Sequence, residues 1–432
     1  GVSAAFRAYA LVLLMSIYTL NFLDRQVVNI LVEKIKADLH LYDWQIGALA
    51  GLSFAALYTV LGFPVARAAD RGDRPLIIGV AIAIWSGCTA LCGLTQNFAQ
   101  LVAARVGVGI GEAGCTPPAV SLITDYTPPD RRASAMAFYT LGGPVGLLIG
   151  MSLGGVAADA WGWRAAFLIV GLPGVVLSVV ALVTLVEPRR KLAAALRTKA
   201  DETPSLAETF REISGKRALW LILFAASIKA FAGFGGGAFT APFFLRNHGG
   251  ELAAAAASLH LQSTGLLGLV LGFSGGLLGI VGVMVGGVVA DRLGARDKRA
   301  YVSIPAVAGV FAAPLSLAAL MTGSFVIAVV LMSLSGLLDY LWFGPTFAAL
   351  QSMVRPRSRA MVVALQLLMT NVIGLGLGPL GVGLISDLFT HQLNLGPAQG
   401  VRFSLVAFVF VGLIGNLLFW MARRTIREEI VS

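Results

Sequence analysis

The sequence predicts an all-α membrane protein with twelve transmembrane helices in two pseudo-symmetric six-helix bundles. Three observations lead to this prediction. The 432 residues are 57% hydrophobic and only 12% charged, about half the charged fraction of soluble domains. The mean hydropathy is +0.83, and apolar stretches long enough to cross a bilayer recur along the chain. Finally, motifs of the first half return in the second half, which indicates an internal repeat.

Each predicted span is an apolar stretch of about 20 residues or more, the length a helix needs to cross the hydrocarbon layer. The first half gives spans at 8–34, 44–68, 76–95, 98–124, 132–157 and 164–186. The second half gives spans at 217–245, 260–290, 300–321, 324–353, 359–386 and 401–422. A long polar stretch separates the two sets. We therefore expect bundles at 1–188 and 217–432, joined by a cytoplasmic linker at 189–216.

The distribution of lysine and arginine predicts the orientation in the membrane. With both termini in the cytoplasm, 24 of the 32 basic residues fall on the inner side and five on the outer side. Cytoplasmic loops carry such an excess, so we expect a multi-pass protein of the cell's inner membrane. The net charge of +10 is explained by this topology, and nothing in the sequence suggests nucleic-acid binding.

The two halves share loop motifs and proline and glycine positions. Asp70–Arg71 follows the second span, and Asp291–Arg292 follows the eighth span 221 positions later. An offset of 228 places five further residues on like residues: Pro117 on Pro345, Arg131 on Arg359, Gly146 on Gly374, Gly150 on Gly378 and Asp159 on Asp387. Such a repeat predicts a twofold bundle with its substrate cavity at the repeat interface.

The repeated loops are candidates for a cytoplasmic gate. Their aspartates can accept backbone N–H groups at a helix N-terminus, and their arginines can pair with acids on adjacent helix ends, such as Asp125 or Asp130. The alternative is a solvated basic turn, but two copies at equivalent places favour a gate. The predicted gate residues are Asp70, Arg71, Arg74, Asp125, Arg131, Asp291 and Arg292.

Charged residues at membrane depth mark the candidate functional site. Asp24 and Arg25 interrupt the first span, and Glu112 lies on the fourth, roughly 21 Å along the helix from its outer end. Such charges are costly in lipid unless they face a partner or a wet cavity. Arg25 comes within plausible reach of Glu112. The alternative for Arg25, snorkelling to the headgroups, leaves the shorter Asp24 unexplained.

A carboxylate beside an arginine at this depth can couple a proton to a substrate. Burial favours the neutral acid, whereas the arginine, which stays protonated, favours the carboxylate. An anionic ligand that takes the guanidinium would therefore change the proton occupancy of Glu112. A permanent structural ion pair is the alternative interpretation.

Further residues in the spans are candidates for the cavity lining. Those in the second half are mainly aromatic or amide side chains, which favours an amphiphile over a sugar acid, although aromatic residues at helical spacing often form core. The candidates are Tyr18, Asn21, Lys229, Phe234, Asp339, Tyr340, Trp342, Gln366 and Asn371.

The repeated loops resemble the cytoplasmic signature of the major facilitator superfamily, which implies two six-helix bundles rocking about a central site. The signature has a glycine four positions before the aspartate; Gly287 fits and Ala66 does not. Asp24–Arg25 together with Gly111–Glu112–Ala113 resembles the spinster family, in a bacterial-type member. This resemblance implies export of sphingolipids or lysolipids, with Arg25 and Glu112 as the working pair and Asp24 assisting proton handling.

We therefore expect a proton-coupled, alternating-access transporter of an anionic amphiphile, acting as a monomer in the bilayer without a cofactor or metal. A proton symporter of small organic anions such as sugar acids remains open, because such symporters of the same superfamily carry the same three charges. An uncoupled facilitator also remains open. An ATP-driven pump is disfavoured because there is no phosphate-binding loop. The other classes are a receptor and a membrane-embedded enzyme, but no histidine reaches the predicted core.

Overall fold

The chain packs as two compact units. The computed structural model describes residues 3–128, 131–188 and 206–431, and the regular structure in these residues is helical, with no β-strand. The first unit comprises Gly1–Ala195 and Gly249–Gly276, and the second comprises Leu196–His248 and Leu277–Ser432. Gly249–Gly276, expected in the second bundle, thus packs with the first. Of the expected linker at 189–216, residues 189–205 lie outside the described residues.

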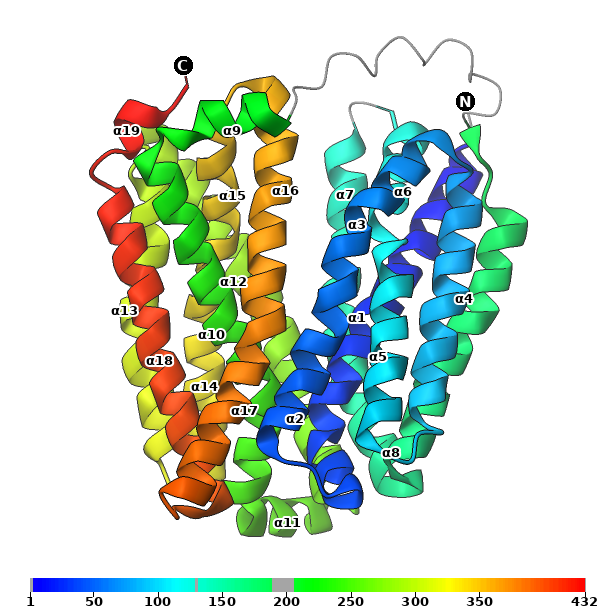
Figure 1. The fold of residues 1–432 in the computed structure, drawn as a ribbon, viewed down its shortest axis with the longest axis vertical. Helices are drawn as coiled ribbons and strands as arrows, with labels where there is room; N and C mark the ends of the chain where they lie inside the picture. Colours follow the sequence, from blue (N-terminus) through cyan, green and yellow to red (C-terminus); the bar gives the residue numbers. More distant parts are fainter. Residues whose placement is uncertain (1–2, 129–130, 189–205, 432) are drawn as a thin grey trace. The chain divides into compact units, whose positions relative to one another are not determined.

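The first unit contains most of the helices before the linker, drawn from blue to green in Figure 1. They are α1 (Ala4–Leu39), α2 (Asp43–Gly47), η1 (Ala48–Leu52), α3 (Ser53–Arg71), α4 (Arg74–Cys92), α5 (Phe98–Ala113), α6 (Thr116–Tyr126), α7 (Arg132–Thr140) and α8 (Gly142–Thr184). To these it adds α11 (Gly249–Ser258) and the beginning of α12 (Ser263–Arg296).

The second unit contains the rest of α12 and the remaining helices. They are α9 (Leu206–Ser214), α10 (Arg217–Asn247), α13 (Ala300–Met321), α14 (Phe325–Asp339), η5 (Tyr340–Trp342), α15 (Phe343–Ser352), η6 (Pro356–Ser358), α16 (Arg359–Met369), η7 (Thr370–Leu377), α17 (Gly378–Asp387), η8 (Leu388–Gln392), α18 (Gly396–Ala422) and α19 (Ile426–Glu429).

The described residues hold eleven segments long and apolar enough to cross a membrane. One of them, Ser134–Thr184, is 51 residues long. Gly162 breaks it with a φ of 85° and a ψ of 163°, a left-handed conformation that favours glycine. This segment therefore supplies two spans, and the predicted all-α fold with twelve spans is confirmed.

A row of glycines fixes the place of α1 in the first unit. Gly142, Gly146, Gly150 and Gly154 recur every four residues on α8, and each lies against α1. A Cβ atom on Gly150 would lie 2.8 Å from the carbonyl oxygen of Leu23. Small residues at this spacing let two membrane helices approach closely. The packing fixes α1 just where Asp24 and Arg25 follow Leu23.

The second unit repeats this packing with the equivalent glycines. Gly374 and Gly378 lie against α10, where a Cβ on Gly378 would come within 2.5 Å of the Phe231 carbonyl oxygen. The offset of 228 pairs them with Gly146 and Gly150. The sequence repeat is thus also a repeat of helix packing, as two pseudo-symmetric bundles require.

The fourth and tenth spans are interrupted at equivalent places. α5 ends at Ala113 and α6 begins at Thr116, with Pro117 in its first turn. In the second unit, α14 ends at Asp339 and η5 leads into α15, whose first turn holds Pro345. A proline lacks the N–H that would continue the helical hydrogen bonds. Glu112 and Asp339 therefore each lie where the first helix of an interrupted span ends.

Candidate substrate and proton-coupling site

Arg25 of α1 and Glu112 of α5 form an ion pair inside the first unit. The Arg25 Nε atom donates to Glu112 Oε2 at 2.7 Å, and Arg25 Nη2 lies 2.6 Å from the same oxygen. The Glu112 side chain is fully buried, whereas 18% of the Arg25 side chain is exposed. The pair that the sequence suggested is present, and the guanidinium is its accessible partner.

Three aromatic rings surround the Arg25 guanidinium. Its Cζ atom lies 4.5 Å from the ring centroid of Phe54, 4.9 Å from that of Tyr58 and 5.4 Å from that of Phe22. Aromatic faces attract cations, and more strongly where water is excluded. The rings therefore stabilise the positive charge of Arg25 without neutralising it.

Glycines of α5 bring the neighbouring helices close to Glu112. A Cβ on Gly109 would lie 2.5 Å from the Phe54 carbonyl oxygen, and one on Gly111 would lie 2.5 Å from the Trp85 backbone nitrogen. These contacts seat α3 and α4 against α5 on either side of the glutamate. This close approach of the helices explains why no water-accessible surface remains on Glu112.

Asp24 lies in the same unit but has a different partner from Arg25. It is 2% exposed, and Thr89 Oγ1 of α4 donates to its Oδ2 atom at 3.1 Å. Its Oδ1 atom has no hydrogen-bond partner among the described residues. A carboxyl group held this way has an unused position for a proton or a donor.

Arg105 of α5 was not among the residues expected in the site. It is 2% exposed, and its Cζ atom lies 5.6 Å from the Phe54 centroid. It acts electrostatically on both Asp24 and Glu112. Two helical turns separate it from Glu112, so one face of α5 carries both charges. This spacing could have shown that Arg105 belongs to the site.

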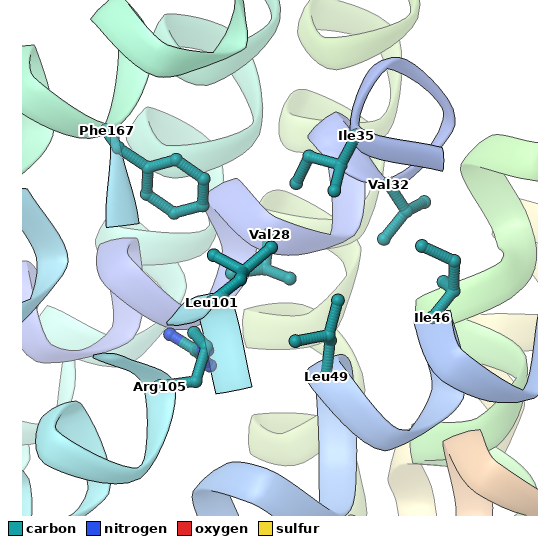
Figure 2. Close-up of a pocket in the computed structure, with 8 residues that line it drawn as sticks. All are labelled: Val28, Val32, Ile35, Ile46, Leu49, Leu101, Arg105 and Phe167. Atoms are coloured by element: carbon teal, nitrogen blue, oxygen red, sulfur yellow. The ribbon is translucent and has the colours of Figure 1, made fainter. Parts of the chain in front are cut away.

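The Arg105 side chain borders a small internal cavity (Figure 2). The cavity has a volume of about 10 Å³, close to what one water molecule occupies. Apart from Arg105, its lining is entirely apolar: Val28, Val32, Ile35, Ile46, Leu49, Leu101 and Phe167. It is too small to hold a substrate.

Tyr18 and Asn21 lie on α1 near the ion pair. Asn21 is 1% exposed and lies beside Glu112. The Tyr18 ring stacks on Tyr139 with centroids 4.6 Å apart and meets Phe22 edge-on at 5.0 Å. Asn21 is therefore a neighbour of the carboxylate, and Tyr18 joins the aromatic side chains next to Arg25.

Arg74, the first residue of α4, is the centre of a network of ion pairs in the first unit. It is fully buried, and its Nη1 atom lies 2.7 Å from Asp125 Oδ2. Its Nε atom donates to Glu187 Oε2 at 2.9 Å, and Nη2 also pairs with Glu187. Asp125, expected as a possible partner of the loop arginines, pairs with Arg74. Glu187, which was not among the expected gate residues, is a buried partner in this network.

The other predicted gate residues are less informative. The Asp70 and Arg71 side chains and Asp130 lie outside the described part of the structure. Arg131 precedes α7 and is exposed, and Asp291 and Arg292 are exposed near the end of α12. The structure thus joins Arg74 and Asp125, and the gate role of the whole set stays a prediction.

The second unit contains another ion pair at membrane depth. Lys229 Nζ of α10 lies 2.5 Å from Asp339 Oδ1 at the end of α14. Of the remaining lining candidates, Phe234 and Tyr340 are exposed, Trp342 and Asn371 are half-buried, and Gln366 is buried. Gln366 therefore lies in the packed interior of its unit.

Two repeated sets of six spans, each with an ion pair between two of its helices, are typical of a secondary membrane transporter. The chain belongs to the major facilitator superfamily, whose family model matches residues 14–379. Within this superfamily it is a transporter of the spinster type, and the predicted resemblance is confirmed. It is therefore a membrane carrier and not an enzyme.

Three similar proteins illustrate this relationship. An "MFS-type efflux pump" of Mycolicibacterium smegmatis is 32% identical over 428 residues, which are 99% of this chain and 95% of the pump. A solved bacterial homologue of the human lysosomal transporter spinster, inward-facing and unoccupied, has a TM-score of 0.87 and 32% identity over 100% of both chains. A probable L-galactonate transporter of Escherichia coli is 30% identical over 66% of this chain and 61% of its own length.

Proposed function

We propose that the protein is a proton-coupled, alternating-access transporter of an anionic amphiphile in the bacterial inner membrane, with both termini cytoplasmic. One observation carries the proposal: the Arg25–Glu112 pair, in which the glutamate is fully buried and the arginine is the accessible partner. An anion approaching this pair meets the guanidinium first.

The chemistry follows from a competition for one guanidinium. A ligand phosphate or carboxylate binds Arg25 and displaces Glu112 Oε2 from Nε and Nη2. The released glutamate is buried without a counterion, so it takes up a proton and becomes neutral. When the ligand leaves, Glu112 pairs with Arg25 again and releases its proton. Substrate and proton therefore bind together and leave together.

Asp24 and Arg105 contribute to the charge balance of this exchange. Together with Arg25 and Glu112 they give the cluster two acids and two bases. Asp24, bound to Thr89, can hold a proton in transit, and Arg105 limits the cost of a second negative charge nearby. We assign Asp24 the assisting role in proton handling.

The surroundings of Arg25 support an amphiphile as the substrate. The groups next to the guanidinium are the rings of Phe22, Phe54 and Tyr58. A sugar acid would need several convergent hydrogen-bonding groups, whereas an amphiphile needs one charged contact and an apolar path.

A small organic anion is the second candidate substrate. It is favoured by the relatives named as transporters of L-galactonate and of hexuronate. Such a substrate would use the same Arg25 and the same exchange with Glu112. An uncoupled facilitator would retain anion binding at Arg25 but take up no proton.

The experiment that separates these functions is a binding and transport screen at two pH values. Purified protein is tested with a single-chain lysophospholipid and with galactonate, and then reconstituted for transport. We expect the lysophospholipid to bind with uptake of a proton and to cross the bilayer. Saturable transport of galactonate without binding of the lysophospholipid would overturn the assignment of an amphiphile as the substrate. Binding without transport would indicate a receptor.

Two structural elements of the proposal concern the whole carrier. We propose that the network of Arg74, Asp125 and Glu187 belongs to the cytoplasmic gate. Separating a buried ion pair is costly, so the network would hold its helices together in one state of the carrier and would have to break in the other. A single chain contains both charge pairs, so we propose that the monomer is the functional unit.

A further inference from the structure

The Lys229–Asp339 ion pair has no part in the exchange at Arg25. Lys229 lies in the interior of α10, with 7% of its side chain exposed, whereas 43% of the Asp339 side chain is exposed. A Cβ on Gly415 of α18 would come within 3.2 Å of the Lys229 Cγ atom, so this glycine makes room for the lysine stem. In this pair the acid is the accessible partner, the reverse of Arg25–Glu112.

Asp339 is exposed at a depth where lipid cannot surround it. It is the last residue of α14, which begins at Phe325, so it lies roughly 21 Å along the helix from the start of its span. A carboxylate facing hydrocarbon at this depth costs several kcal/mol, and such groups face a wet cavity instead. We therefore expect the exposed part of the Asp339 carboxylate to face water.

The helix end at Asp339 adds a second attraction for positive charge. The C-terminus of a helix carries partial negative charge on its last carbonyl groups. α14 stops at this residue and continues as the 3₁₀ turn η5. Two glycines of α12 hold the break in place: Cβ atoms on Gly282 and Gly286 would lie 2.7 Å from the Leu337 and 2.9 Å from the Leu341 carbonyl oxygens.

Lys229 occupies one part of this negatively charged site. Its Nζ atom binds Oδ1, but an aspartate carboxylate has two oxygens and about four lone pairs, so it can accept a second donor. The ammonium group is the protein's own cation at the site. A cation that comes from the water competes with it.

We propose that Asp339, at the end of α14, is a binding site for a monovalent cation or for the ammonium group of a ligand, in competition with Lys229. The site goes beyond proton exchange at Glu112 and does not depend on it. It gives the second half of the carrier a place for positive charge, where the first half binds negative charge.

The test is a cation titration of the purified protein in detergent, read as the thermal unfolding midpoint. The probes are Na⁺, K⁺ and tetramethylammonium, each as the chloride and at equal ionic strength. The variants are Lys229→Met, which removes the internal competitor, and Lys229→Met/Asp339→Asn, the matched control for general salt effects.

In Lys229→Met, we expect a saturable rise of the midpoint, with an apparent Kd on the order of tenfold lower than in the wild type. The double variant should show no saturable response. A response confined to Na⁺ or K⁺ identifies an inorganic ion, and one confined to tetramethylammonium identifies a ligand head group. Equal responses of the single and double variants would overturn the proposal. The Lys229–Asp339 ion pair would then have only a structural role.

A second comparison covers the case in which Lys229→Met does not fold. The wild type and Asp339→Asn are titrated in the same way. The wild type must respond saturably to one of the cations, and Asp339→Asn must lose the response. Equal responses contradict the proposal. Transport and pH dependence are not part of the readout, so failure here leaves the proposed function of Arg25 and Glu112 intact, and the reverse also holds.

Discussion

At the scale of single residues, the two partners of the main ion pair differ in exposure. Glu112 is fully buried and Arg25 is partly exposed, so in the proposed exchange the ligand binds one partner and the proton binds the other. This asymmetry gives each residue a separate experimental signature. Replacing the acid should affect the proton, and replacing the base should affect the ligand.

Glu112→Gln should remove the pH dependence of substrate binding. In the wild type, one coupled proton makes the affinity fall about tenfold per pH unit over the pH range in which Glu112 is ionised when paired and protonated when released. A glutamine cannot take up this proton, so its binding curve should be flat. Binding measured over a pH series decides the question. A variant as pH-dependent as the wild type would rule out the coupling role.

Arg25→Lys should weaken binding of the anion by about tenfold to a hundredfold, although the charge is kept. The guanidinium contacts Glu112 through Nε and Nη2 and lies over Phe54, and an ammonium offers no planar fork for either arrangement. Equilibrium binding at fixed pH measures the effect. Affinity equal to that of the wild type would mean that Arg25 acts only as a distant charge.

At the scale of helices, glycine rows position the charged residues. On α8 the row from Gly142 to Gly154 holds α1, and on α5 Gly109 and Gly111 hold α3 and α4. Because most of these glycines lie against backbone atoms, an added methyl group there must displace a helix. The sites therefore depend on residues that carry no chemistry themselves.

Gly146→Ala should destabilise the protein by about 1–3 kcal/mol. The added Cβ would overlap the Thr19 carbonyl oxygen and lie 2.7 Å from the Phe22 Cβ. Gly87→Ala on α4 is the matched control, since nothing lies within 4 Å of its new Cβ. The control should be neutral or slightly more stable. Thermal unfolding of both variants in detergent provides the comparison, and equal midpoints would contradict it.

Glu212 of α9 attaches this short helix to the segment after α15. It accepts hydrogen bonds from the Arg355 backbone nitrogen at 2.8 Å and from Ser358 Oγ at 2.6 Å. Burial alone would raise the pKa of Glu212, but these two hydrogen bonds and the nearby Lys216 and Arg355 lower it below its usual value. The ionised form is therefore the one that the folded protein stabilises.

Glu212→Gln should cost about 1 kcal/mol at neutral pH. Because the pKa is lower in the folded state, the contribution of the wild-type glutamate is complete above the ordinary pKa and is lost as the pH falls through the folded pKa. The difference between wild type and variant should thus shrink below about pH 4. Ser358→Ala removes one of the two donors and should give a smaller effect. Unfolding midpoints over a pH series measure both, and a difference that grows on acidification would refute the assignment.

At the scale of the whole molecule, the fold class and the main ion pair could be predicted from the sequence, and several partners could not. Twelve spans follow from hydropathy, and Arg25 and Glu112 follow from their depth. The partner of Arg74 could not be predicted because Glu187 lies 113 residues away at the start of a polar stretch. The hydrogen bond from Thr89 to Asp24 could not be predicted either, since nothing in the sequence around Thr89 distinguishes it from a packing residue of α4.

A reconstituted carrier should accumulate its substrate only while a proton gradient exists. If one proton accompanies each anion, collapsing the gradient with a protonophore should reduce accumulation to equilibration across the membrane. Equilibrative exchange should continue, because Arg25 still binds the anion. Uptake is followed in proteoliposomes with and without the protonophore, and protein-free liposomes serve as the control. Accumulation that survives the protonophore would contradict proton coupling.

The interruptions before Pro117 and Pro345 bear on how movement passes through the carrier. Each of these two spans is built from two shorter rods, α5 with α6 and α14 with α15, and not from one continuous rod. A continuous rod tilts as one body, so a shift at one membrane face reaches the other at once. A jointed rod can bend at its middle, so one of its two segments can tilt while the other keeps its packing contacts. The joints lie beside Glu112 and Asp339, so bending at a joint would change the position of these charged side chains before that of more distant residues.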